Sequence, residues 1–198
     1  MIRRIVPLLL LSAAPTLYAQ GLPSGWMARP DKGDASGVHF ITMGPGFHVH
    51  PGTAAVLYRE SDKVTGKFHA IVKFVQTKAP THPEGYGMFF GGSDLQGPNQ
   101  KYTYFLVRGD GKYLVKTREG AETSSVVGWT DSDAIAKQDA DGKCTNTVEI
   151  DATGAKVAFK VNGKTVYEMD APSRDGIVGL RVNHNLDLHL DGFGVHQM

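Results

Sequence analysis

The sequence cannot form an intramolecular disulfide, because its 198 residues include a single cysteine, Cys144. No electropositive motif surrounds this residue in the sequence, so we expect a partly buried and inert thiol. Stability must therefore come from a packed core. A chain of this length is long enough to bury one.

The sequence also lacks a charge excess and a long apolar run. Its formal net charge is +1, and no run of Lys or Arg occurs, which argues against a nucleic-acid partner. The apolar run of residues 5–11 is too short to span a membrane. We therefore expect no nucleic-acid partner and no membrane span, and we expect a monomer.

The N-terminal residues have the pattern of an export signal. Arg3 and Arg4 precede the apolar run, and small residues follow it as far as Ala19. We expect residues 1–19 to be a signal peptide and residues 20–198 to form one domain. The expected location is secreted or periplasmic, in a bacterium.

The segment from Gly85 to Arg118 carries the clearest structural pattern. Residues 101–108 alternate with a period of two, residues 109–111 (Gly-Asp-Gly) suit a tight turn, and residues 112–118 alternate again. The apolar side of this hairpin, expected to face the core, carries Phe105, Val107, Tyr113 and Val115.

Short alternating segments continue through the rest of the chain. Further strands are expected at residues 38–42, 47–49, 53–59, 66–76, 86–91, 123–129, 147–151, 157–161, 165–168, 177–183 and 186–195. Asn162-Gly163 is a strong hairpin signal, and the glycines of residues 86–91 suggest a bulge. Residues 131–137 suggest one short helix. The pattern predicts an all-β sandwich.

The other side of the hairpin is the candidate ligand surface. It combines flat aromatic rings with fixed hydrogen-bond donors, which suits a polar ligand such as a sugar. The alternative is an ordinary strand face, since Tyr is common in strands and Lys and Arg commonly cover exposed sheets. The residues of this side are Tyr102, Tyr104, Arg108, Lys116 and Arg118.

Several segments together resemble a known superfamily. They are Lys101 to Tyr113, Asn146 to Ile150, Phe159 to Gly163, Gly176 to Val182 and Asp191 to Val195. The chain resembles the concanavalin A-like lectin/glucanase sandwiches, and most of all the exported bacterial domains named 3-keto-disaccharide hydrolase or domain of unknown function. The resemblance implies a jelly roll of two curved antiparallel sheets that binds ligands on its concave face.

The carboxylates do not complete a glucanase motif. Glu149-Ile150-Asp151 is similar to the Glu-x-Asp-x-Glu strand of laminarinase-type enzymes, but Thr153 stands where the last carboxylate belongs. We interpret Glu149 and Asp151 as a solvated strand face. If the protein is an enzyme, the groups to test are Glu84, Asp94 and His184, which lie in loops beside the aromatic strands.

The metal signals are sparse. His48 and His50 share one strand face, but no carboxylate follows at a ligand spacing, so structural roles are the simpler interpretation. The resemblance to the superfamily suggests a structural Ca²⁺ at Asp191, but one carboxylate does not make a calcium site. The expectation is no metal and no cofactor.

The leading hypothesis is an exported, carbohydrate-associated β-sandwich that binds a saccharide on its concave sheet face. The alternatives are a glycoside hydrolase acting on (keto-)glucosides or disaccharides, and a periplasmic structural or interaction domain without a small ligand. The predicted ligand-binding residues are Arg59, Tyr86, Tyr102, Tyr104, Arg108, Lys116, Arg118, Asn183 and His189.

Overall fold

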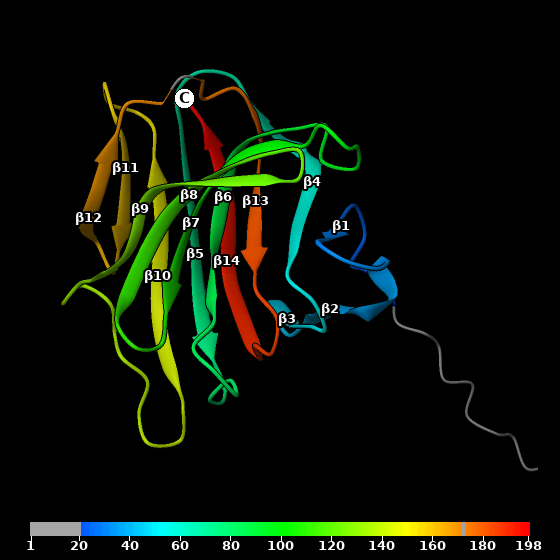
Figure 1. Cartoon of the computed structure of the whole chain (residues 1–198), viewed down its shortest axis with the longest axis vertical. Helices are drawn as coiled ribbons and strands as arrows, with labels where there is room; N and C mark the ends of the chain where they lie inside the picture. The colour runs from blue at the N-terminus through cyan, green and yellow to red at the C-terminus, as the bar shows by residue number, and fades with distance from the viewer. Residues whose placement is uncertain (1–20, 172) are drawn as a thin grey trace, which may run out of the picture.

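The computed structural model describes residues 21–171 and 173–198, which form two seven-stranded sheets. Every pairing within them is antiparallel. Figure 1 shows the sheets overlapping, with β11 and β12 on one side and β1 on the other. The predicted all-β sandwich of two antiparallel sheets is confirmed. The expected signal segment, residues 1–19, lies outside the described residues.

We call the two layers the first and second sheets. In spatial order the first sheet consists of β1 (Met27–Pro30), β4 (Ala55–Val64), β13 (Gly176–Val182), β6 (Gly85–Ser93), β7 (Lys101–Arg108), β8 (Lys112–Glu119) and β9 (Glu122–Asp131). The second sheet consists of β12 (Lys164–Met169), β11 (Val157–Val161), β10 (Cys144–Asp151), β5 (Phe68–Gln76), β14 (Leu188–Gln197), β3 (Gly46–Pro51) and β2 (Val38–Met43). One 3₁₀ turn, η1 (Ala35–Gly37), precedes β2.

The main core lies between the sheets and follows from the alternation of the strands. Phe105, Val107, Tyr113 and Val115 all belong to it, as the sequence predicted.

Asn162 and Gly163 both have positive φ, at 51° and 78°, as a two-residue hairpin between β11 and β12 requires. The predicted bulge in β6 is a register shift between Phe90 and Ser93. Burial of alternate side chains therefore fixes which face of each strand is free.

The predicted short helix at residues 131–137 is wrong. Asn146 of β10 accepts a hydrogen bond from the backbone of Ala136 at 2.8 Å and donates one to its carbonyl at 3.1 Å. Ala134 and Ile135 are buried in the core. Tertiary contacts therefore hold this segment in a non-helical form. In the described part of the chain, no helix has the length and apolar character needed to cross a membrane.

Candidate functional site

A second apolar cluster covers the face of the first sheet that points away from the second sheet, which we call the outer face. It is separate from the core between the sheets. Its buried members are Val56, Tyr58, Phe89, Leu95, Tyr102, Tyr104, Leu106, Leu114 and Ile177. An apolar outer face is unusual for a surface sheet in water, so the groups that cover it decide whether it can bind a ligand.

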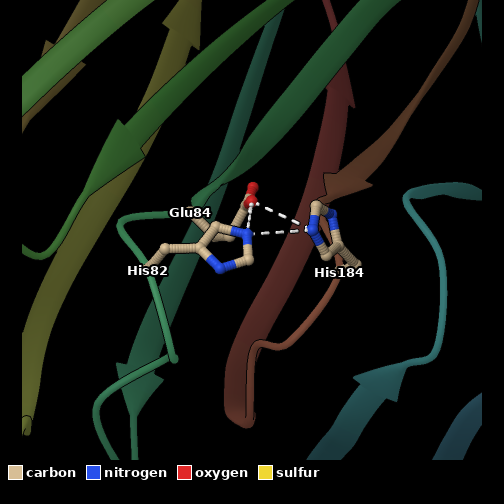
Figure 2. A group of neighbouring side chains, drawn as sticks. All are labelled: His82, Glu84 and His184. Atoms are coloured by element: carbon tan, nitrogen blue, oxygen red, sulfur yellow. Dashed lines mark hydrogen bonds and ion pairs between the residues drawn. The ribbon is translucent and has the colours of Figure 1, made fainter.

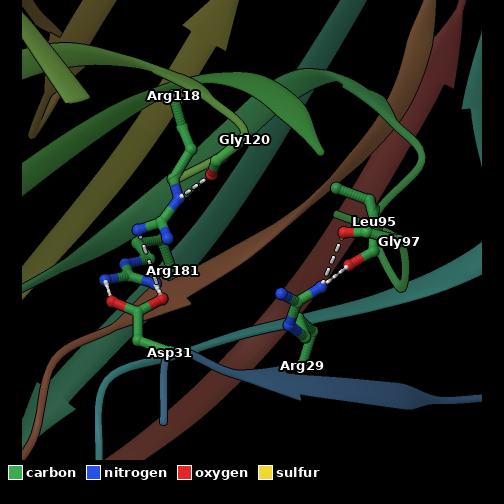
Figure 3. Close-up of polar contacts among 7 residues, drawn as sticks. All are labelled: Arg29, Asp31, Leu95, Gly97, Arg118, Gly120 and Arg181. Carbon is green, nitrogen blue, oxygen red and sulfur yellow. Dashed lines mark hydrogen bonds and ion pairs between the residues drawn. The ribbon is translucent and has the colours of Figure 1, made fainter. Parts of the chain in front are cut away.

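Charged side chains cover one half of the outer face. We call Arg29, Asp31, Arg118 and Arg181 the arginine cluster, which Figure 3 shows. Asp31 follows β1 and accepts two hydrogen bonds from Arg181, at 2.8 and 2.6 Å. Arg118 of β8 approaches Asp31 at 3.6 Å and donates to the carbonyl of Gly120 at 3.0 Å. Arg29 donates to the carbonyls of Leu95 and Gly97.

These contacts pair Asp31 with Arg181 and bind Arg29 and Arg118 to backbone carbonyls. Burial acts to raise the pKa of Asp31, but the hydrogen bond and charge of Arg181, with the charges of Arg118 and Arg29, hold this pKa below its usual range. The Arg181 side chain is only 7 % exposed. Its Nε is one of two buried side-chain polar atoms in the described residues without a partner. The cluster therefore ties β1 to β13 and β8.

The tyrosines beneath this cluster are nearly covered. Tyr102 is 4 % exposed and Tyr104 is 7 % exposed, and burial raises the pKa of both hydroxyls. The guanidinium carbon of Arg181 lies 5.7 Å from the centroid of the Tyr104 ring. A ring with so little free surface cannot offer a flat face to a sugar.

The other half of the outer face offers an accessible aromatic ring. Trp129 of β9 is 37 % exposed, and the guanidinium carbon of Arg108 lies 4.2 Å from the centroid of its ring. A Cβ added to Gly85 would come within 2.9 Å of the indole Cη2 atom and 3.1 Å of Leu106 Cδ1. The missing side chain at Gly85 therefore makes room for the indole across the sheet.

A polar cluster lies directly beside Gly85. His82 and Glu84 precede β6, while His184 follows the end of β13, and Figure 2 shows the three side chains pointing toward one another. Glu84 Oε1 lies 2.8 Å from His82 Nε2 and 3.2 Å from His184 Nε2, and the two nitrogens are 3.1 Å apart. We call these residues the His–Glu–His cluster.

The main chain holds this cluster in place. Asn183 donates its backbone N–H to the carbonyl of Gly85 at 3.0 Å, which extends the pairing of β13 with β6. Its side chain donates to Glu84 Oε2 at 2.9 Å. The Glu84 side chain is 11 % exposed, whereas His82 and His184 are 53 % and 42 % exposed. The carboxylate is thus fixed, and the imidazoles reach solvent.

An open hollow of about 470 Å³ lies between the arginine cluster and His184. Asp31 and Arg181 line it from the arginine cluster, and Asn183 and His184 line it from the strand ends. Lys32 and the segment Gly52, Thr53 and Ala54 complete its wall. Its volume is within the range of small-molecule sites.

Five predicted ligand-binding residues share the outer face. In the register of β7 and β8, Tyr102 lies opposite Arg118 and Tyr104 lies opposite Lys116. Residues directly opposite each other in a sheet share a face. Arg108, the last residue of β7, lies against Trp129. Asn183 joins them at the strand ends, through Glu84.

The expectation of one shared face is wrong for Arg59, Tyr86 and His189. Tyr86 is 0 % exposed in the core between the sheets, because the register of β6 places it with Met88 and Phe90. Its hydroxyl lies near Asn146 and the thiol of Cys144. That thiol is buried, as expected, and burial raises its pKa.

Arg59 and His189 lie elsewhere for similar reasons. The guanidinium carbon of Arg59 lies 4.9 Å from the ring centroid of Trp26, which belongs to the core between the sheets, and its Nε donates to Asp62. His189 is in β14 of the second sheet and lies 3.0 Å from Asp191. Neither side chain contributes to the outer face of the first sheet.

The candidate catalytic residues separate into two places. Glu84 and His184 are 3.2 Å apart, but Asp94 follows the opposite end of β6. A nine-residue strand spans roughly 25–30 Å. A glycosidase carboxylate pair is at most about 9.5 Å apart, so Glu84 and Asp94 do not form one. Asp94 instead accepts the backbone N–H of Asn99.

The remaining acidic candidates lie in the second sheet. Glu149 of β10 lies 3.1 Å from His69, and Asp151 lies 2.6 Å from the Lys160 ammonium group. Asp191 lies 2.7 Å from Lys73. These carboxylates are engaged by basic or imidazole side chains of the second sheet, away from Trp129.

Sequence reasoning missed Trp129, Asp31 and His82 as members of the site. Trp129 had a usable signal, since it is a large aromatic in a strand whose other residues are small, polar or valine. Asp31 had none, because it reaches Arg181 over 150 positions of sequence. The convergence of His82 and His184 depends on the neighbouring positions of β6 and β13, which strand periodicity does not reveal.

Comparison by sequence matches the chain to no protein family and to no curated protein. By structure it is similar to the carbohydrate-binding module CBM66 from Bacillus subtilis, with a TM-score of 0.64 and 12 % identity over 87 % of this chain and 95 % of that one. It is similar to a glycoside hydrolase family 16 endo-glucanase from Bacteroides ovatus, with a TM-score of 0.59 and 10 % identity over 89 % and 97 %.

A third similar structure is a protein of unknown function with a galectin-like fold from Bacillus subtilis, with a TM-score of 0.58 and 13 % identity over 87 % and 89 %. The chain therefore has the jelly-roll fold of the concanavalin A-like sandwiches. Identities of this size establish the fold alone, so the function is argued from the site.

Proposed function

We propose that the protein binds a saccharide on the outer face of the first sheet, at the end formed by Trp129, Arg108, Asn183 and the His–Glu–His cluster. The observation that carries this proposal is the half-exposed Trp129 indole, which lies between Arg108 and Gly85. An accessible ring beside fixed polar groups matches the two-sided chemistry of a sugar, whose C–H faces are apolar and whose hydroxyls need partners.

The groups around the indole supply both kinds of hydrogen bond. Arg108 offers donors, although Asp110 accepts from two of its nitrogens. His82 and His184 offer ring nitrogens at the solvent boundary, and the hollow beside His184 has room for a sugar unit. A saccharide stacked on Trp129 could meet these groups without disturbing the arginine cluster.

The similarity in fold to a carbohydrate-binding module supports this proposal in general terms. The N-terminal pattern of residues 1–19 supports export, so we propose a secreted or periplasmic bacterial protein that acts on saccharides outside the cytoplasm.

A glycan array with the purified full chain, followed by calorimetric titration of the best ligand, tests the proposal. Trp129→Ala should weaken binding by roughly 30-fold, as expected for a central aromatic contact. The matched control is Met43→Ala, which removes another exposed large apolar side chain, on β2 of the second sheet. The proposal fails if no glycan binds, or if both variants bind as the original protein does.

A second candidate function is hydrolysis of a glucoside or disaccharide, including the 3-keto sugars that the sequence resemblance suggests. The observation in its favour is Glu84, a largely covered carboxylate between two imidazoles beside the proposed sugar site. Such a group can exchange a proton with a bound substrate. Release of reducing sugar or keto-sugar that is lost in Glu84→Gln, with binding retained, supports hydrolysis; binding without release supports a binding protein.

A further inference from the structure

The His–Glu–His cluster is built from two segments that are distant in sequence. His82 and Glu84 come from the segment before β6, and His184 comes 100 residues later, after β13. Three ligand atoms, His82 Nε2, Glu84 Oε1 and His184 Nε2, face a common centre. We infer that they form a binding site for one divalent transition-metal ion of the zinc type.

The distances fit a metal bound on one side of the three atoms. The three ligand atoms are separated from one another by 2.8, 3.1 and 3.2 Å. A point about 2 Å from all three therefore exists about 1 Å outside their plane, and about 2 Å is the length of zinc bonds to histidine nitrogen and carboxylate oxygen. The cluster can accept the ion with only small movements of the side chains.

The chemistry of the cluster favours a cation over simple hydrogen bonding. Both imidazoles direct Nε2 at the same carboxylate oxygen, Oε1, while the other oxygen, Oε2, accepts from Asn183. With both rings protonated at Nε2, two like partial charges lie 3.1 Å apart. A metal ion instead accepts a lone pair from each nitrogen and from the oxygen.

Neighbouring groups orient two of the three ligands. Asn183 holds the Glu84 carboxylate at 2.9 Å, and Thr81 Oγ1 lies 3.2 Å from His82 Nδ1. Partners of this kind fix the ring orientation and tautomer of metal-binding histidines. Asn183 is in turn fixed to the main chain of β6. The site is thus supported by the sheet as well as by its own loops.

The ligand types select the class of metal. Two imidazoles and one carboxylate suit zinc and its first-row neighbours, whereas Ca²⁺ prefers six to eight oxygen ligands. Three protein ligands leave at least one coordination position for water or another molecule. The exposed imidazoles make the position reachable from solvent.

This inference goes beyond saccharide binding and does not depend on it. A bound metal would take the Nε2 atoms of His82 and His184, and a sugar would then keep Trp129 and Arg108 as its contacts. The cluster can bind a metal with no sugar present, so a titration with metal alone can fail or succeed separately from the saccharide test.

Isothermal titration of the EDTA-treated full chain with ZnCl₂ tests the metal site. We expect one tight equivalent per chain. His184→Ala and Glu84→Gln should each weaken it on the order of 100-fold, and Asn183→Ala by about 10-fold, because that residue only orients the carboxylate. His189→Ala is the matched control, since this histidine also lies 3.0 Å from a carboxylate but belongs to the second sheet; it should leave the affinity unchanged.

A second readout separates coordination from loss of folding. Co²⁺ in place of zinc should give visible absorption bands that vanish in His82→Ala and persist in His189→Ala, while circular dichroism shows all variants folded. The inference is overturned if no tight equivalent is found. It is also overturned if the tight equivalent survives in folded His82→Ala and His184→Ala.

Discussion

The two halves of the outer face contain similar residue types but differ in how their groups are used. In the arginine cluster Asp31 binds Arg181 through two hydrogen bonds, and Tyr102 and Tyr104 lie nearly covered beneath it. At the other half Trp129 and two histidines reach solvent. A cluster whose opposite charges are paired and largely covered stabilises the fold, whereas one with free surface can bind a ligand.

The largest expected effect tests whether the arginine cluster stabilises the fold. Asp31→Asn should lower the free energy of unfolding by about 3 kcal/mol at neutral pH, because it leaves the buried Arg181 charge without its counter-charge. Urea unfolding measures this change.

The control is Asp191→Asn, which breaks a more exposed pair with Lys73 on the second sheet, where less than about 1 kcal/mol is expected. Equal losses in the two variants would remove the distinction between a buried cluster and a surface ion pair.

Asp31→Asn should also change how the free energy of unfolding depends on pH. The pKa of Asp31 is lowered in the folded protein. The stabilisation by its carboxylate is therefore fully present above the unfolded pKa of about 3.9, and it is lost as pH falls through the folded pKa. The stability difference between the original protein and Asp31→Asn should therefore be constant near neutral pH and shrink below about pH 4. A difference that grows on acidification contradicts the assigned role.

A smaller effect tests the space that Gly85 leaves for the indole. Gly85→Ala places a methyl group against Cη2 of Trp129, so the ring must move, and saccharide affinity should fall by about 10-fold. Gly128→Ala is the matched control on β9, because a Cβ there meets nothing within 4 Å. Calorimetry with the same ligand compares the two, and equal affinities would mean that the ring position is unimportant.

The smallest effect is expected from Tyr104→Phe. Its ring is 7 % exposed, so removal of the hydroxyl should change saccharide affinity by less than about twofold. A loss of saccharide affinity of more than tenfold in direct binding measurements would place the ligand on the arginine cluster instead of beside Trp129.

Local pattern was enough to predict the sandwich and the faces of its central hairpin. Phe105 and Val107 lie inside, and Tyr104 and Arg108 lie outside, because alternation and burial follow from the strand period. The same reasoning misplaced Tyr86, since a strand full of glycine does not reveal which face is buried.

The site itself depends on sheet order, which local pattern does not contain. Glu84 and His184 were both candidates, but only the pairing of β13 with β6 brings them within 3.2 Å. Arg181 could not be assigned to Asp31 from sequence, because nothing local links the two. Trp129 could have been singled out as the large aromatic residue of its strand, but its position depends on the missing side chain at Gly85.

The most direct test of the account follows the two indole N–H signals in a ¹⁵N-labelled sample as saccharide is added. Trp26 is 6 % exposed in the core between the sheets, and Trp129 is 37 % exposed on the outer face. The account predicts that the Trp129 signal shifts with saturation while the Trp26 signal stays in place. A saturating ligand that leaves the Trp129 signal unmoved would contradict the proposed site.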